Sequence, residues 1–379
     1  MKLKRGRNPR VLSGHPWVYL GEVQRTLSQD QNGAAVACFD SRGRCLGSGI
    51  YNENSQIIWR RFSQDRCDFD ESFLRKAIHN SLSRRNPHES VKRLIWSEAD
   101  SIPGLVVDQY DEVLVMQCLT LAVDQRSKLI ADILCELTGA LYVVLRNDAP
   151  VRTLEGLDRY VSLLVGNDLK PSWIKVGDVE FWIDFMQGQK TGFYLDQRYQ
   201  YLEVAKLAKD KHVLDTFCNQ GGFALHCARH GAASVLALDS SEEAVNLGRK
   251  NAEHNQLSVE WMSVNVFDYF SANKNKHWDL IILDPPSFAR NKNKVQDAVR
   301  GYNELNLRAL QALNPGGILA TYSCSHHISH ELFEEVLVSA AADAHCQPRL
   351  LNTVIQPQDH PVILGIPETE YLKGMILEV

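Results

Sequence analysis

The spacing of hydrophobic and polar positions changes twice along this chain of 379 residues. Over residues 1–66, turn-forming residues interrupt short apolar runs and no long helical period develops, which predicts a small all-β module. Residues 69–86 then place apolar side chains at helical spacing, and 91–165 alternates strand-like runs with a second helix near 124–138. We therefore predict a central α+β domain over residues 67–170.

Beyond residue 171 the chain alternates short apolar runs with segments of helical length. The runs are Val213–Leu214, Val235–Leu238, Leu280–Leu283 and Ile318–Tyr322. Alternation of this kind predicts a parallel, doubly wound sheet. The expected fold class is α/β, with a Rossmann-like C-terminal domain over residues 171–379 that begins after a boundary within 166–180.

Composition narrows the class of protein. Hydrophobic residues make up 44% of the chain and charged residues 23%, which is typical of a soluble globular protein. No segment approaches the ~18 apolar residues of a membrane span, and the basic start lacks the apolar stretch of a secretory signal. Nine cysteines occur without zinc spacing. We expect a cytoplasmic protein with free thiols, no metal and no membrane partner; a homo-oligomer is compatible with the sequence.

The net charge of −5 is unevenly distributed along the chain. Residues 1–66 contain 11 Lys and Arg against 5 Asp and Glu, a balance of +6, whereas the remainder contains 30 against 41. Two interpretations remain open. The N-terminal module contacts nucleic-acid phosphate, or it carries a solvated basic face without a partner.

The sequence from Val213 to Phe223 predicts a ligand-binding loop. A strand ends in Asp215, and a turn with Gly221 and Gly222 opens the next helix. Ligands of such sheets bind at the carboxyl ends of strands, and glycines let the backbone approach them closely. The dinucleotide fingerprint is missing, and Asp215 would repel a pyrophosphate but accept a hydrogen bond from an ammonium group. This favours a methionine-type cofactor, which Phe217, Cys218 and Asn219 would also line.

Two later strand ends supply further cofactor candidates. Asp239 follows Asp215 by 24 residues, near the ~20 expected for an acid on ribose hydroxyls. Alternatively Asp239 only caps a helix. Ser240, beside it, forms a possible capping box with Glu243.

A third strand end carries Asn265 and Val266. The Asn265 amide could accept from an adenine amino group while Val266 packs on the ring. The alternative is that Asn265 is only a turn residue.

Asp284-Pro285-Pro286 directly follows the third apolar run. Two prolines end the ladder and fix a rigid loop, so we assign Asp284 to both the catalytic and the cofactor-binding set. A purely structural turn is the alternative. Enzymes that methylate exocyclic base nitrogens carry a similar motif with an aromatic residue directly after the prolines, where this chain has Ser287.

Cys324 lies at the end of the fourth apolar run, where the substrate should bind. Isolated cysteines are usually buried and inert. Cytosine C5, however, is too weakly nucleophilic to accept a methyl group unless a thiolate first adds to C6. Asp284 could then hydrogen-bond or protonate N3. Cys218 is the competing nucleophile, although it lies in the cofactor loop.

Together these residues give the chain a resemblance to the bacterial large-subunit (23S) ribosomal RNA 5-methylcytosine methyltransferase family. That family combines a PUA domain, a central α+β domain and a class I S-adenosylmethionine-dependent methyltransferase domain. The resemblance extends over nearly the whole chain, and its landmarks are Gly14–Tyr19, Ile102–Asp108 and Gly188–Arg198.

The resemblance implies the roles already considered for these residues and adds others. It implies S-adenosylmethionine as cofactor, Cys324 as nucleophile with Asp284 as its partner, and ribosomal RNA held by the PUA domain. It also implies four residues near the methionine end of the cofactor, which are Lys190, Thr191, Tyr194 and Arg198. The chain departs from the family at Asn265 and at the pair His326-His327, which contacts RNA phosphate or cofactor carboxylate or only forms a turn. The segment Tyr371–Gly374 resembles the closing hairpin, and we assign it no chemistry.

Three functions therefore compete. The first is S-adenosylmethionine-dependent cytosine-C5 methylation of large-subunit ribosomal RNA through a Cys324 adduct. The second is methylation of an exocyclic amino nitrogen, adenine N6 or guanine N2, by the Asp-Pro-Pro motif without a covalent step. The third is a non-catalytic RNA-binding or ribosome assembly protein.

Overall fold

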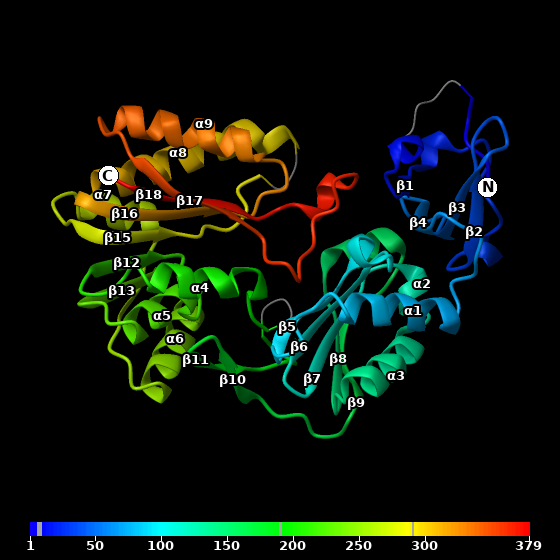
Figure 1. Ribbon diagram of the computed structural model, residues 1–379, viewed down its shortest axis with the longest axis horizontal. Coiled ribbons are helices and arrows are strands. Elements are labelled where there is room, and N and C mark those ends of the chain that lie inside the picture. The colour runs from blue at the N-terminus through cyan, green and yellow to red at the C-terminus, as the bar shows by residue number, and fades with distance from the viewer. Residues whose placement is uncertain (6–9, 189–191, 290–291) are drawn as a thin grey trace. The chain divides into compact units, whose positions relative to one another are not determined.

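The computed structural model describes residues 1–5, 10–188, 192–289 and 292–379 (Figure 1). The chain forms two compact units, each assembled from three chain segments. The first unit contains Met1–Ser172, Ile183–Leu195 and Gln358–Thr369. The second contains Trp173–Trp182, Asp196–Pro357 and Glu370–Val379.

A four-stranded antiparallel sheet forms the N-terminal part of the first unit. In spatial order its strands are β1 (Trp17–Val18), β4 (Trp59–Ser63), β3 (Cys45–Tyr51) and β2 (Ala35–Phe39). On β2 the buried residues Val36 and Cys38 alternate with half-buried neighbours, as the pleat of a strand with one face on a core requires. Only short 3₁₀ turns accompany these strands in the described part of residues 1–66, which confirms the predicted all-β module.

The same unit contains a five-stranded sheet. Its order is β5 (Val91–Trp96), β6 (Leu105–Tyr110), β7 (Val113–Cys118), β8 (Tyr142–Asn147) and β9 (Tyr160–Val165), antiparallel except between β7 and β8. The helices with it are α1 (Glu71–Leu82), α2 (Leu121–Asp124) and α3 (Ser127–Thr138). Helix α1 begins where the Asp70 side chain accepts a hydrogen bond from Phe73 N at 2.9 Å. Both predicted helices of the α+β region are therefore present.

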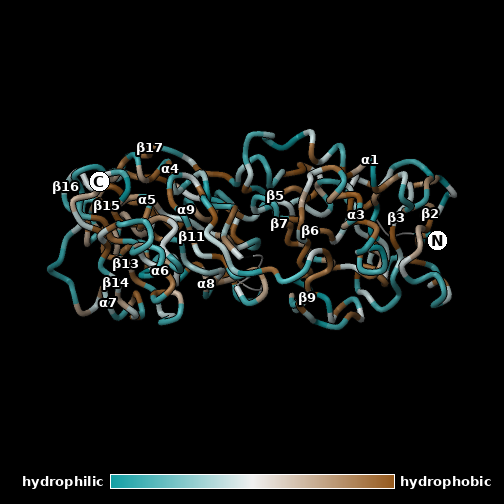
Figure 2. Tube along the Cα trace, turned by 90° about the horizontal axis from the view of Figure 1, so that it is seen from below, coloured by the Kyte–Doolittle hydropathy of each residue, from teal (hydrophilic) through white to brown (hydrophobic). Residues whose placement is uncertain are grey.

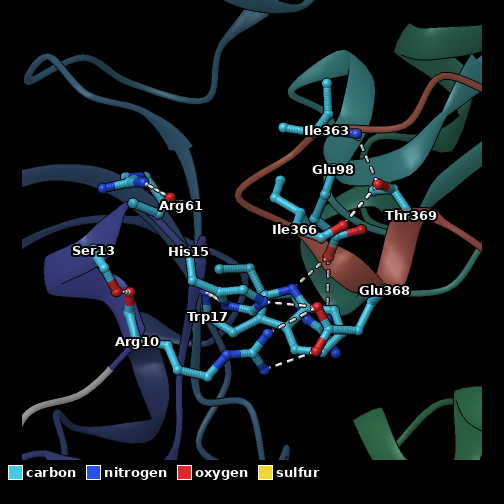
Figure 3. A network of polar contacts seen from close by, with 12 residues as sticks. Arg10, Ser13, His15, Trp17, Arg61, Glu98, Ile363, Ile366, Glu368 and Thr369 are labelled. Carbon is cyan, nitrogen blue, oxygen red and sulfur yellow. Dashed lines mark hydrogen bonds and ion pairs between the residues drawn. The ribbon is translucent and has the colours of Figure 1, made fainter. Parts of the chain in front are cut away.

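A polar network within the first unit involves Glu368, which comes from the C-terminal part of the chain (Figure 3). Its carboxylate accepts from Arg10 Nη1 at 2.7 Å and lies 2.8 Å from His15 Nε2. Burial raises the pKa of Glu368, but the hydrogen bonds from Arg10 and His15 outweigh it and bring that pKa to about 2. Trp17 Nε1 donates to Glu98 at 2.8 Å. The landmark residues His15 and Trp17 thus bind other parts of their own unit.

The second unit is built on a seven-stranded sheet. Its order is β14 (Glu260–Ser263), β13 (Ser234–Asp239), β12 (His212–Thr216), β15 (Trp278–Leu283), β16 (Leu313–Ser323), β18 (Lys373–Glu378) and β17 (Arg349–Ile355). The first five strands are parallel and the last two antiparallel. The predicted parallel sheet is confirmed. Strand order reverses between β12 and β15, which makes this position the switch point of the sheet.

Helices cover both faces of this sheet (Figure 1). On one face lie α4 (Arg198–Ala205), α5 (Gly222–Arg229) and α6 (Glu242–His254), and on the other α7 (Val266–Ala272), α8 (Val295–Gln311) and α9 (His330–Asp343). The core beneath α8 and α9 includes the fully buried Leu214, Ile281 and Leu319 on three adjacent strands. These central strands are hydrophobic along most of their length, whereas the outer loops are polar (Figure 2).

One local detail differs from the predictions, and the predicted boundary segment contains regular structure. Helix α6 has Ser241 rather than Ser240 as its N-cap, with Ser241 Oγ accepting from Ala244 N at 3.2 Å, so the predicted capping box is wrong. The segment 166–180 contains strand β10 (Ser172–Val176), which pairs with β11 (Val179–Ile183). A strand forms there because Ile174 and Val176 are buried on one face.

Some features of the described residues bear on function class. All nine cysteines are free. Within the described ranges, no three His, Cys, Asp or Glu side chains gather closely enough to hold a metal ion. The helices there are too short or too polar to span a bilayer.

Candidate active site

Three predicted residues lie at one edge of the seven-stranded sheet. Asp215 is the penultimate residue of β12, Asp284 directly follows β15, and Cys324 directly follows β16. The register pairs Thr216 with Leu283 and Leu283 with Thr321, so these strands end at nearly the same level. Because strand order reverses between β12 and β15, this edge is where open α/β sheets bind ligands.

The Asp215 carboxyl group is buried and only half satisfied. It is 1% exposed, and Oδ2 accepts from Ala224 N at 2.9 Å. Among the described residues, Oδ1 has no hydrogen-bond partner. Burial raises the pKa of Asp215 well above its usual range, the hydrogen bond from Ala224 opposes this, and the charges of Asp284 and Asp239 add to it. A cation bound next to Asp215 would stabilise its buried carboxylate, so this residue favours binding of a positively charged ligand group.

Asp284 lies beside a residue that the sequence analysis did not single out. Gln197 Nε2 donates to Asp284 Oδ1 at 3.0 Å. Gln197 is 2% exposed, and its Oε1 has no partner in the described ranges. It belongs to the Gly188–Arg198 landmark, so only that landmark could have pointed to it.

Cys324 is half-buried against the Asp-Pro-Pro loop. Its Sγ donates to Pro285 O at 3.8 Å. Hydroxyl groups on both sides hold the two loops together, because Ser287 Oγ lies 2.9 Å from Ser325 Oγ. Tyr302 of α8 completes the network, with its hydroxyl 3.0 Å from Ser325 Oγ. The residue that replaces the usual aromatic, Ser287, thus connects the carboxylate loop to the cysteine loop.

Cys218, the competing thiol, is in a different environment. It is 5% exposed, and its N–H donates to Leu238 O at 2.8 Å. Burial raises the pKa of the Cys218 thiol well above its usual range, and the neighbouring Asp215 and Asp239 charges add to that rise. A thiol in this state is a poor nucleophile at neutral pH.

Asp239 connects the glycine loop to the start of α6. Its Oδ2 accepts from Asn219 N at 2.9 Å and its Oδ1 from Ser241 N at 2.9 Å. Asp239 is therefore not the cap residue itself. Ser240 is exposed, and Phe217 and Asn219 are half-buried, each of the latter two with positive φ.

Gly221 and Gly222 permit close packing within the protein itself. Gly221 has φ +93°, and a Cβ there would lie 2.5 Å from a Trp261 ring carbon. A Cβ on Gly222 would lie 2.6 Å from the Tyr201 ring. The close approach that these glycines allow is thus used by Trp261 and Tyr201 around the loop.

The third strand-end pair has structural partners. Asn265 caps α7, with its Oδ1 accepting from Phe267 N at 2.9 Å. Val266 is 3% exposed and packs in the sheet core. Both residues follow β14, as expected, but Asn265 Oδ1 already accepts one bond and the Val266 side chain is largely covered by protein.

The remaining candidates belong to different parts of the chain. Lys190 and Thr191 lie outside the described residues. Tyr194 belongs to the first unit, whereas Arg198 begins α4 in the second, 6% exposed and donating to Tyr199 OH at 2.8 Å. His326 and His327 lie in a turn, and their role stays a prediction.

Two models of known protein families match separate parts of the chain. A model described as PUA-like domain matches residues 1–64. A model described as S-adenosylmethionine-dependent methyltransferase matches residues 152–366, more than half of the chain.

Whole-chain relatives agree. Ribosomal RNA large subunit methyltransferase I of Serratia proteamaculans (strain 568) is 35% identical over 394 residues, covering 100% of this chain and 98% of the relative. The protein of the same name from Tolumonas auensis is 33% identical over 390 residues, covering 99% and 98%. A solved structure described as a methyltransferase complexed with SAH has a TM-score of 0.84 at 20% identity, covering 98% of this chain and 97% of that one. At that identity the likeness establishes the fold.

The packing of the glycine loop yields a stability prediction. Gly221→Ala should lower the free energy of unfolding by more than Gly316→Ala, measured by chemical denaturation. Gly316 also has positive φ, +76°, but a Cβ there meets nothing within 4 Å. Gly316→Ala should therefore cost only backbone strain, about 1–2 kcal/mol, while Gly221→Ala adds the clash with Trp261, typically about 1–3 kcal/mol more. Equal losses would show that Trp261 moves aside freely.

Proposed function

This chain belongs to the ribosomal RNA large subunit methyltransferase I family of S-adenosylmethionine-dependent methyltransferases, and we propose on that premise that it methylates C5 of a cytosine in large-subunit ribosomal RNA. The nucleophile in this proposal is Cys324. The names of the relatives support the substrate class. The choice of base rests on the chemistry of the site.

The observation that carries the proposal is a half-buried thiol at the sheet edge beside Asp284. Cys324 Sγ lies 3.8 Å from the carbonyl of Pro285, the residue after Asp284. Methylation of an exocyclic amino group has no use for a thiol, because the amino nitrogen bears a usable lone pair. Cytosine C5 needs one, since only addition at C6 gives C5 enough electron density. The pairing of a thiol with the carboxylate loop therefore favours cytosine.

The residues of this edge suit S-adenosylmethionine. Asp215 offers a buried carboxylate oxygen without a protein partner in the described ranges, which would accept from the cofactor ammonium. Asp239 would bind ribose hydroxyls, and the Asn265 side chain would contact adenine. When bound, the cofactor supplies a methyl group on a positively charged sulfur. Lys190, Thr191, Tyr194 and Arg198 enter the methionine end only through the family resemblance.

The protein side chains perform the covalent steps. The Cys324 thiolate uses its electron pair to form a bond to C6 of the pyrimidine, and the C5–C6 double bond shifts its electrons toward C5. Asp284 stabilises the charge that develops at N3 by a hydrogen bond or a proton. After C5 carries the methyl group, solvent water takes the C5 proton, the electron pair of that C–H bond restores the C5–C6 double bond, the C6–S bond breaks, and any proton on N3 returns to Asp284. The thiolate leaves with its electron pair.

The N-terminal module would hold the RNA. Three arginines in the described part of this module form ion pairs within the protein: Arg10 with Glu368, Arg44 with Asp40, and Arg60 with Glu98 and Glu155. Other basic residues of this module are exposed and would face phosphate: Lys2, Arg5, Arg25, Arg42 and Arg66. These side chains, rather than the whole +6 balance, would supply the attraction.

Base identity after methylation tests the proposal. The full chain is incubated with methyl-labelled S-adenosylmethionine and ribosomal RNA, and the nucleosides are identified by mass spectrometry. We expect labelled 5-methylcytosine from the wild type, none above background from Cys324→Ala, and most of the wild-type rate from Cys346→Ala. Cys346 is the matched control because it is half-buried like Cys324 and no step of the proposal uses it.

Other outcomes would contradict this assignment. Labelled methyladenine or methylguanine, with full turnover by Cys324→Ala, would indicate the amino-nitrogen reaction. No heat of binding with S-adenosylmethionine in calorimetry would indicate an RNA-binding protein without catalysis.

Asp215 permits a separate test of the cofactor site. Asp215→Asn should weaken SAH binding about 10- to 100-fold in calorimetry, since a hydrogen bond to a charged group contributes about 1.5–3 kcal/mol. The same change should not lower the melting temperature, because it removes a buried charge that burial disfavours. Asp279→Asn is the control, as Asp279 lies at the amino end of β15 and bonds His212 N and Asn314. Unchanged affinity in Asp215→Asn would remove Asp215 from the site.

A further inference from the structure

A buried lysine lies directly beside the cysteine loop. Lys373 begins β18, where it pairs with Ser323, the last residue of β16. Its side chain is 2% exposed. The ammonium donates to Ser325 O at 2.8 Å and to Ile328 O at 2.6 Å. These carbonyls come one and four residues after Cys324, so Lys373 holds the chain that follows the thiol.

The charge of this ammonium is not neutralised by an acid. Among the described residues Lys373 forms no ion pair, and its hydrogen bonds go to neutral carbonyls. Burial lowers the pKa of Lys373 to about 8, while Cys324 and Glu370 act in the opposite direction. Glu370 Oε1 lies 3.2 Å from His330 Nε2. A buried cation without a counter-ion is costly, and a nearby group that becomes an anion relieves that cost.

On the side of the Asp-Pro-Pro loop, the described neighbours of the cysteine loop are hydroxyl groups and the acid Asp284, which precedes Pro285. Tyr302, Ser287 and Ser325 form the hydroxyl network there, and Ser323 Oγ donates to Tyr302 OH at 3.0 Å. Burial raises the pKa of Tyr302, so the phenol stays protonated at neutral pH and provides no positive charge for the thiol. Lys373 acts on Cys324 from β18 as a cation.

We propose that Lys373 is a positioning residue for Cys324, because its buried ammonium fixes the loop after the thiol and favours the thiolate over the thiol. The inference rests on the proposed function, in which the thiolate adds to the pyrimidine. In the ionisation the S–H bond breaks, sulfur keeps the electron pair and the proton passes to solvent. Lys373 keeps its three N–H bonds throughout. The segment Tyr371–Gly374, to which the sequence analysis gave no chemistry, thereby acquires a role.

Alkylation of Cys324 in the protein without RNA or cofactor tests whether Lys373 favours the thiolate. Iodoacetamide reacts with the thiolate, and peptide mass spectrometry follows each cysteine separately across pH. In the wild type, Cys324 should reach half of its maximal rate at lower pH than the exposed Cys45 and Cys67, which serve as internal references. If the pH of half-maximal alkylation of Cys324 were equal to or above that of Cys45 and Cys67, the proposal would be overturned. This experiment needs no variant.

A second experiment removes the positive charge of Lys373 by substitution. Lys373→Met should slow Cys324 alkylation about tenfold at pH 7, as expected for a thiol pKa higher by about one, with little change at pH 10. Lys373→Arg should retain the wild-type profile, and Lys209→Met, an exposed lysine of the same unit, is the control. If Lys373→Met slowed Cys324 alkylation equally at pH 7 and pH 10, Lys373 would have only a structural role and the proposal would be overturned. An alkylation profile identical to that of the wild type would overturn it as well.

The two proposals fail separately. If Lys373→Met does not fold, as judged by circular dichroism and SAH binding, the wild-type and Lys373→Arg profiles decide. A shifted profile in a protein that makes no 5-methylcytosine would keep the thiolate inference and reject the proposed function. If the protein makes 5-methylcytosine but the alkylation profile of Cys324 is not shifted, the proposed function stands and the thiolate inference is rejected.

Discussion

Parallel pairing across the switch point of the seven-stranded sheet is the constraint on which the site depends. Strands β12, β15 and β16 run in the same direction with their ends in register, so the residues that follow them meet at one edge. Asp215, Asp284 and Cys324 are separated by 69 and 40 positions in the sequence. Only the sheet brings them together, and a change in register of one strand would move its residue away from the others.

The edge of this sheet contains polar groups that the fold alone does not satisfy. One oxygen of Asp215 has no partner among the described residues, and the Lys373 ammonium has only neutral acceptors there. A fold selected for stability alone would avoid both, since each buried charge without a counter-ion costs free energy. Their presence fits an edge that completes its interactions when a cationic cofactor binds and a thiol ionises.

Local pattern was enough to predict the strands and the residues at their ends. Periodicity located β12, β13, β15 and β16, and a residue at a strand end needs only that location to become a site candidate. Helix starts were less secure, because Ser240 and Ser241 are both good caps and backbone geometry chooses between them. Site residues that do not lie at the end of a predicted strand could not be found from local pattern.

The roles of Gln197, Ser325 and Lys373 depend on contacts with segments far away in the sequence. Lys373 meets the cysteine loop 45 and 48 positions before it, through an antiparallel strand that returns beside β16. No spacing rule connects a lysine to carbonyls at that distance. His15 and Trp17 illustrate the reverse case, because they form a recognisable motif but bond to Glu368 and Glu98 within the protein.

Trapping of the covalent intermediate tests the central claim most directly. Ribosomal RNA containing 5-fluorocytidine, incubated with the full chain and S-adenosylmethionine, cannot lose a proton from C5, so the adduct cannot resolve. The account predicts a stable protein–RNA complex whose nucleotide is attached to the peptide containing Cys324. Attachment to Cys218, or transfer of the methyl group to cytosine C5 in unmodified RNA by a Cys324→Ala variant, would contradict it.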